Sequence, residues 1–352
     1  MRNKSYKIIV SVLVVCFFSL HTMGQAKPYF NQYLLNNYII NPAITGIENY
    51  TDIRASYKKQ WVGIDGAPTT QYVTVHTPIG KNDSRTNPNS FFVRGGNDND
   101  IIAGEQSGED VTAHHGVGLM FLNDKAGYIS RMNFSGSYAY HLPLGRRFMI
   151  SAGISAGLSK FSVDATKSNL ATTGQNPNDP ALGSSSFYYQ LNKNLLELGT
   201  GIYVYSPYMY AGFSVLNIVP SKKNSFGIDE GTSFTPNYIA TAGVKFVLND
   251  DFYLTPSAML QYWQPSLKCL NMSAKLQYLD LAWIGANYRS SDAVGGYAAM
   301  AGFNVANTFN FSYCYEMSPN SELQNFTKAT HEVMFGIILG NNYSNIFRRN
   351  NP

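Results

Sequence analysis

The sequence has few cysteines, few charges and no long apolar run beyond its start, and each shortage excludes a class of protein. Three cysteines in 352 residues are too few for a disulfide framework. Charged residues make up 14% of the chain, against about 25% in ordinary soluble domains. After the first apolar stretch, no run reaches the ~20 residues that a membrane helix needs. If the chain enters a membrane, it must do so as strands.

Zinc-protease and phosphate-loop motifs are absent, and no cluster of Lys and Arg suggests a nucleic-acid partner. We therefore expect neither an enzyme nor a nucleic-acid-binding protein, and no cofactor. Because outer-membrane phospholipases place Ser and His on barrel strands, a lipid-modifying enzyme stays open as a third alternative.

The first 25 residues have the features of a secretory signal. Arg2, Lys4 and Lys7 precede a short apolar run, and Thr22 and Gly24 are small residues at the positions that fit cleavage near Gln25. Removing three of the 26 basic residues leaves 23, against 22 acidic residues, so the mature chain is near neutral. Of the cysteines, Cys269 and Cys314 remain; they could pair, but we expect free, buried thiols.

The mature chain is rich in aromatic residues, with 25 Tyr and 21 Phe, and it alternates with a period of two. In residues 131–140, apolar Met132, Phe134 and Tyr138 alternate with polar residues. Residues 147–162, 237–248, 268–278 and 308–316 behave alike. This period places apolar groups on one face of a strand and polar groups on the other.

Such segments predict an all-β, transmembrane antiparallel barrel of about fourteen strands. They lie near residues 52–61, 69–78, 115–123, 128–141, 147–162, 194–206, 208–217, 237–248, 252–263, 268–278, 281–289, 293–305, 308–316 and 330–340. If both ends of the chain lie in the periplasm, short turns should follow the even strands. Five of six do so, and residues 79–114 are the exception: an insertion, or an unrecognised strand pair that uses Phe91 to Arg94.

A soluble β-sandwich or propeller also has alternating strands. Strands of ten to fifteen residues suit a tilted membrane crossing better than a sandwich, where five or six are usual. Aromatic residues near strand ends, among them Tyr138, Tyr203, Tyr205 and Tyr210, indicate an interfacial girdle. We expect location in the outer membrane of a Gram-negative bacterium, with membrane lipid as one partner.

Candidate metal ligands are few. His114 and His115 are adjacent, so on a strand they point to opposite faces and could not readily hold one ion. Residues 97–110 carry five acidic groups but do not match a calcium loop. Inward Arg131, Glu197, Lys245, Lys275 and Arg289 could pair with charges across the interior or line a channel, and we favour pairing.

The first hairpin carries the most distinctive stretch, Gln60-Trp61-Val62-Gly63-Ile64-Asp65-Gly66-Ala67-Pro68. With Asn31-Gln32-Tyr33, Asn41-Pro42-Ala43, Asn287-Tyr288-Arg289 and Thr330-His331-Glu332, it resembles the PorP/SprF family of Bacteroidetes outer-membrane proteins. The resemblance implies a role in the type IX secretion system and, in gliding motility, in display of adhesins at the cell surface. It brings no catalytic residues. The residues it suggests for partner binding are Asn41, Pro42, Gln60, Trp61, Gly63, Asp65, Gly66 and Pro68; for the glycines and Pro68, setting the turn is the competing interpretation.

The predicted organisation is a signal peptide (1–25), a periplasmic lead-in or plug (26–48), the barrel (49–340) and a C-terminal tail (341–352). The predicted function is that of a non-enzymatic accessory and anchor for protein secretion and display of a specific type IX cargo protein, with other secretion components as possible partners. The alternative is a porin or a channel for hydrophobic compounds.

Overall fold

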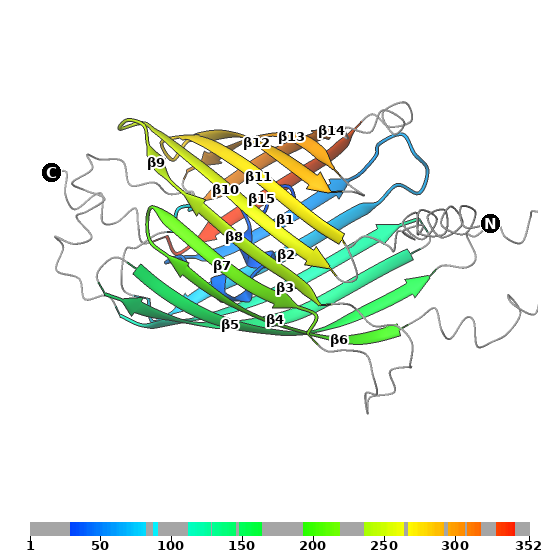
Figure 1. Cartoon of the computed structure of the whole chain (residues 1–352), viewed down its shortest axis with the longest axis horizontal. Helices are drawn as coiled ribbons and strands as arrows, with labels where there is room; N and C mark the ends of the chain where they lie inside the picture. The colour runs from blue at the N-terminus through cyan, green and yellow to red at the C-terminus, as the bar shows by residue number, and fades with distance from the viewer. Residues whose placement is uncertain are drawn as a thin grey trace, which may run out of the picture.

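A computed structural model describes residues 29–81, 87–90, 112–127, 129–145, 148–163, 193–218, 236–263, 267–291, 295–306, 308–317 and 329–341. They form one closed antiparallel β-barrel whose strands incline to its long axis (Figure 1). The strands are β1(Thr51–Lys59), β2(Thr69–Ile79), β3(His114–Ala126), β4(Ile129–Leu144), β5(Phe148–Val163), β6(Lys193–Tyr205), β7(Met209–Leu216), β8(Asn237–Val244), β9(Phe246–Val247), β10(Phe252–Trp263), β11(Leu267–Tyr278), β12(Ala282–Ser291), β13(Gly296–Val305), β14(Phe309–Met317) and β15(Thr330–Leu339).

Fourteen strands cross the wall, as predicted, because β8 and β9 are two parts of one strand. Both pair with β10, one after the other, and the register brings Pro256 of β10 to the interruption. Proline has no N–H with which to continue the ladder there. Pairing of β1 with β15 closes the barrel.

The predicted alternation of faces is confirmed. On β5, the outward side chains of Ile154 and Leu158 are 61% and 65% exposed, whereas inward Ser151 and Ser159 are buried. Outward apolar groups suit lipid, and the inward polar groups face a lumen filled with protein. Among the residues described, no helix is long and apolar enough to cross a membrane.

The two ends of the barrel differ in their connections. At one end, the turn end, three or four residues of sequence separate β4 from β5, β6 from β7, β9 from β10, β11 from β12 and β13 from β14. The opposite end, the loop end, carries the hairpin tip at 60–68; there β5, β7 and β14 end, and each is separated from the next strand by more than ten residues of sequence. By the usual rule for outer-membrane barrels, short turns face the periplasm.

The exception to this rule, residues 80–113 between β2 and β3, is an insertion. Strands β2 and β3 pair directly from Thr69 opposite Lys125 to Ile79 opposite His115, which leaves no place for another strand pair between them. Phe91 to Arg94 lie outside the described residues, as do residues 97–110 with the candidate calcium ligands.

The predicted girdle is confirmed in part. Outward aromatic pairs lie near both ends, for example Tyr288 with Tyr297 and Phe303 with Phe311. Tyr203, Tyr205 and Tyr210 are different: they are buried and point into the lumen. Assigning them to the girdle was wrong, because inward aromatic residues pack on the chain inside the barrel.

Candidate functional site: a plugged lumen

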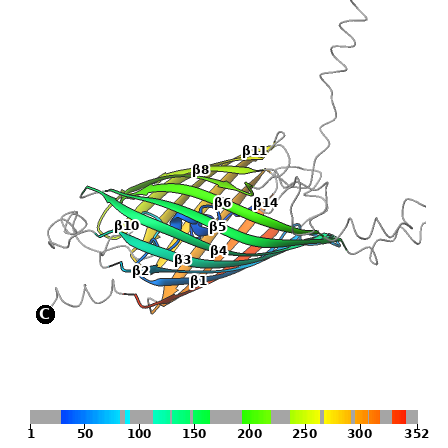
Figure 2. The ribbon, with the colours of Figure 1, turned by 90° about the horizontal axis from the view of Figure 1, so that it is seen from below.

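The N-terminal segment, residues 29–50, fills the lumen, and we call it the plug. It is seen inside the ring of strands in Figure 2. Every residue from Asn31 to Tyr50 is buried. Its backbone forms two single turns of 3-10 helix, η1(Asn37–Ile39) and η2(Pro42–Ile44).

Local sequence explains the second turn. The Asn41 side chain accepts a hydrogen bond from the Ala43 N–H at 2.9 Å, which caps the turn, and Pro42 takes the first position, where an N–H has no partner.

The plug crosses the lumen from the loop end to the turn end. Tyr29, the first described residue, lies beside Glu316 near the loop end of β14. Midway, the hydroxyls of Tyr33 and Ser257 share a hydrogen bond of 2.9 Å. Near the turn end, the carbonyl oxygen of Thr45 lies 2.8 Å from Nε2 of His141, and β1 then begins.

Charged side chains hold the plug at the loop end. Arg289 pairs with Glu316, and its other terminal nitrogen donates to Oδ1 of Asn31 at 2.7 Å. Nζ of Lys58 and Cζ of Arg289 lie 3.3 and 3.5 Å from the centroid of the Tyr29 ring. Two cations on one buried ring form an anchor that combines charge with packing.

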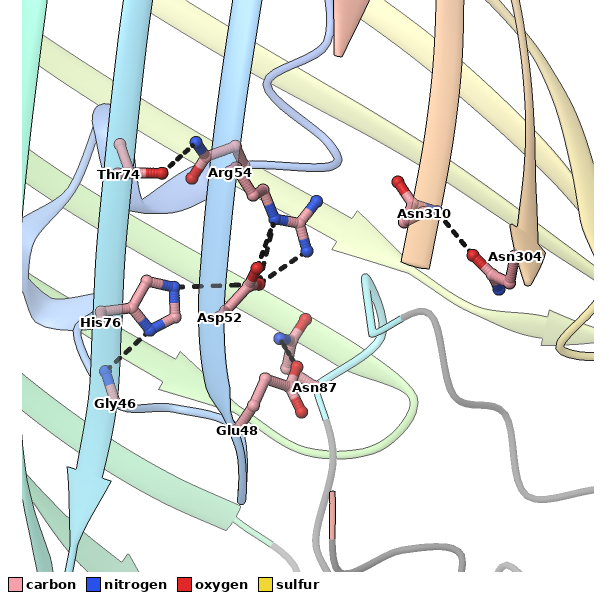
Figure 3. A network of polar contacts seen from close by, with 10 residues as sticks. Gly46, Glu48, Asp52, Arg54, Thr74, His76, Asn87, Asn304 and Asn310 are labelled. Carbon is pink, nitrogen blue, oxygen red and sulfur yellow. Dashed lines mark hydrogen bonds and ion pairs between the residues drawn. The ribbon is translucent and has the colours of Figure 1, made fainter. Parts of the chain in front are cut away.

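A second polar network holds the plug near the turn end (Figure 3). Asp52 binds Arg54 through both carboxylate oxygens and lies 4.0 Å from His76. The backbone N–H of Gly46 donates to Nδ1 of His76 at 3.3 Å. Nδ2 of Asn87, from the β2–β3 insertion, donates to Glu48 at 2.6 Å.

Four glycines of the wall form a seat for residues 41–46 of the plug. A Cβ on Gly116, Gly153 or Gly201 would lie closer than 3.0 Å to Thr45, Pro42 or Asn41 respectively, a separation that real Cβ atoms essentially never show. At Gly212 an added Cβ would lie 2.6 Å from the Tyr203 ring and 3.0 Å from Nδ2 of Asn41. At Gly116 and Gly153 glycine is needed because the two backbones approach closely, whereas at Gly201 the close neighbour is the Asn41 side chain. The seat residues are Gly116, Gly153, Gly201 and Gly212, from β3, β5, β6 and β7.

Hydrogen bonds from the wall complete this seat. The Ser151 hydroxyl donates to the carbonyl oxygen of Ala43 at 2.7 Å, and that of Ser214 donates to Ile40 at 2.6 Å. The Tyr38 hydroxyl shares a 2.8 Å hydrogen bond with the Ser137 hydroxyl.

The residues suggested for partner binding fall into two places. Asn41 and Pro42 are buried in the plug, whereas Gln60 to Pro68 form the hairpin tip at the loop end. Gly63, Asp65 and Gly66 are exposed there, and Gln60 is buried.

The tip has a fixed backbone. Gly63 and Gly66 have φ of 109° and 73°, and Trp61 has φ of 46°. The N–H of Val62 donates to the carbonyl oxygen of Ala329 at 2.9 Å, and the N–H of Gly127 donates to the carbonyl oxygen of Gly66 at 2.8 Å. The positive φ of both glycines is one that glycine adopts without strain, and Asp65 is the charged side chain that the turn exposes.

The interior charges pair in part as expected. Arg131 bonds to Glu197, and Arg289 bonds to Glu316; Lys245 and Lys275 are also buried. Cys269 and Cys314 are free and buried. His114 is buried and stacks on His141 with ring centroids 4.3 Å apart, while His115 is exposed on the outer face. Among the described residues, no group of three His, Cys, Asp or Glu is placed to hold a metal ion.

One catalytic sequence pattern does occur, G-x-S-x-G at Gly153 to Gly157. In a hydrolase this pattern forms a sharp turn between a strand and a helix. Here Ser155 lies in the middle of β5, opposite Ser137 on β4 and Gly199 on β6. The geometry of a nucleophile elbow is therefore missing at this serine.

The chain is similar to several solved outer-membrane proteins, at low sequence identity. The Acinetobacter baumannii outer membrane protein Omp33 is 8% identical, with 84% of this chain and 99% of that chain covered at a TM-score of 0.45. The CymD monoaromatic hydrocarbon channel is 11% identical, with 90% and 94% covered at 0.48. The Ralstonia pickettii toluene transporter TbuX is 8% identical, with 90% and 95% covered at 0.46.

No curated protein sequence matches the chain. The family model described as "Type IX secretion system membrane protein PorP/SprF" matches residues 22–337, which include the plug, the hairpin tip and all the strands but the end of the last. The chain therefore belongs to the PorP/SprF family of type IX secretion system membrane proteins, and it is an outer-membrane barrel.

Proposed function

We propose that this barrel is a non-enzymatic accessory and anchor for the secretion and surface display of one type IX cargo protein, which binds at the loop end. The observation that carries the proposal is the plug. A segment that is buried along its length and held at both ends obstructs passage through the lumen. It suits a barrel that binds a partner on its surface better than one that transports a solute.

The hairpin tip supports the loop end as the binding side. Backbone hydrogen bonds to Ala329 and Gly127 hold it rigid, so little conformational entropy is lost when a partner binds. It presents Asp65 and Gly66 outward, next to the ends of β3 and β15.

Gene deletion with complementation tests the proposal. Cells without the protein should lose the cargo from their surface, as measured by proteomics of proteins released from whole cells by protease. Complementation with wild type should restore it, and D65A should restore barrel assembly without full display. Unchanged display in the deletion strain would refute the anchor function.

A channel for hydrophobic compounds is the second candidate, favoured by a cavity beside the plug. Planar-bilayer recordings separate the two proposals. A seated plug predicts no open-channel current from wild type, whereas steady current would favour the channel.

A further inference from the structure

Charge is distributed unequally over the outer face of the barrel wall. The carboxylates of the described strands all lie at inward-facing positions: Asp52, Asp124, Glu197, Glu316 and Glu332. The exposed, outward-facing lysines of these strands all lie near the loop end, on β1, β3, β5 and β11: Lys59, Lys125, Lys160 and Lys268. The outer face is therefore basic at the loop end.

Two of these lysines lie on either side of one residue, and we call Lys59 and Lys125 the outer lysine pair. The strand register places Thr69 of β2 opposite Lys59 on one side and opposite Lys125 on the other. Neighbouring strands are about 4.8 Å apart, so the two Cα atoms are separated by roughly 10 Å. Lysine has a long, flexible stem, so both ammonium groups can reach one small anion between them. Within the described part of the chain, neither lysine forms an ion pair with a carboxylate.

The outer lysine pair lies at the edge of the apolar face. From the loop end inward along β2, the outward residues Thr69 and Gln71 are followed by Val73. On β3, Phe121 lies four residues from Lys125 on the same face, and it is paired with Val73. Val73 and Phe121 are 43% and 41% exposed, as residues in contact with acyl chains would be. A lysine at such an edge packs its stem on apolar surface and holds its ammonium group at the level of the lipid headgroups.

By the rule of short periplasmic turns, these headgroups belong to the outer leaflet. We propose that the outer lysine pair binds the phosphate of the phosphorylated glycolipid of this leaflet, lipid A. One ammonium group lies on each side of the phosphate, and the Thr69 hydroxyl donates between them. The edge of the apolar face favours a lipid over an acidic protein segment, which would meet the hairpin tip first.

Native mass spectrometry of the purified full-length barrel in detergent tests the proposal, with diphosphorylated lipid A as the probe. Wild type should retain a bound lipid A. K59Q and K125Q should each weaken binding about fivefold, and the double variant about 25-fold. The variant with arginine at both positions keeps the charge and should still bind.

K268Q is the matched control. Lys268 is exposed at the same end of the barrel, but the residue opposite it on β10 is Tyr262, so it has no second lysine beside it there. This variant should bind lipid A as wild type does. Heat-modifiable migration on gels checks that all variants fold. Absence of bound lipid A from wild type, or equal weakening by K268Q and K125Q, would overturn the proposal.

Two further measurements identify the lipid phosphate as the ligand. Lipid A from which the phosphates have been removed should bind wild type as weakly as intact lipid A binds the double variant. Millimolar inorganic phosphate should not displace intact lipid A, because the free ion has no acyl chains to pack on the apolar face. Equal binding of the dephosphorylated lipid, or displacement by inorganic phosphate, would refute a lipid phosphate site. The assay contains no cargo, so its result is independent of the anchor function.

Discussion

Replacing Gly153 by alanine should unseat the plug without opening the barrel wall. The added Cβ would lie closer than 3.0 Å to backbone atoms of Pro42 and Ala43. Ordinary carbon contacts are about 3.5–4.0 Å, so the plug would have to retreat by at least about 0.5 Å. It cannot slide easily, because its two ends are held by Arg289 and by the Asp52 network.

The cost can be estimated from the contacts that this retreat breaks. Three hydrogen bonds depend on the present position: Ser151 to Ala43, Asn41 to Ile202, and His141 with Thr45. At about 1 kcal/mol each they amount to roughly 3 kcal/mol, and overpacking adds about 1–3 kcal/mol. The loss of about 4–6 kcal/mol is enough to shift the plug locally, while the strand ladders of β5 remain.

Hydrogen exchange and single-channel recording should detect the change. Backbone amides of residues 43–47 should exchange faster in G153A, and brief conductance steps should appear where wild type shows none. G136A is the matched control, because an added Cβ at Gly136 has its nearest neighbour at 3.8 Å. If G153A keeps wild-type protection and stays closed, the glycine seat does not hold the plug.

Three further outcomes follow from the same geometry. An antibody should bind an epitope inserted just before Tyr29 from the same side of the membrane as one inserted at Gly63, since both residues lie at the loop end. Binding from the opposite side would contradict the direction in which the plug crosses the lumen. R289M should lower the unfolding temperature in detergent more than E316Q does. Removing one partner of a buried ion pair costs about 3–5 kcal/mol, whereas the neutral amide of E316Q keeps part of the hydrogen bonding. Equal unfolding temperatures of R289M and wild type would refute the anchor. Replacing Trp61 by proline should disturb assembly, because proline can neither adopt the φ of 46° found here nor supply the N–H that bonds to Thr330. Normal heat-modifiable migration of W61P on gels would refute this.

The barrel wall was predictable because its physics is local. Alternation with a period of two fixes which side chains meet lipid, and Phe134 and Met272 lie outward as their pattern requires. The strand bounds agree with the structure to within a few residues. Pairing of each strand with the next in sequence then leaves one topology for an even number of strands.

The path of the plug was not predictable in this way. Nothing in residues 29–50 alternates, and burial there depends on strands that lie far away in sequence. Tyr203 and Tyr205 resembled girdle residues because an aromatic near a strand end has the same pattern whether it meets lipid or a plug. The available signal was glycine at inward-facing positions of adjacent strands, as at Gly153 and Gly201. A wall that faced only water would not require the absence of a side chain at these positions.

The β2–β3 insertion and the plug belong to one arrangement. The insertion breaks the rule of short turns at the turn end, and that is the end at which the plug leaves the lumen to begin β1. Its described residues 87–90 are buried, and Asn87 binds Glu48 of the plug. A barrel with an empty lumen would need no such cover. A chain that enters its own lumen at the loop end and leaves it at the turn end exposes polar backbone there, and the insertion supplies the partners that this backbone and Glu48 require.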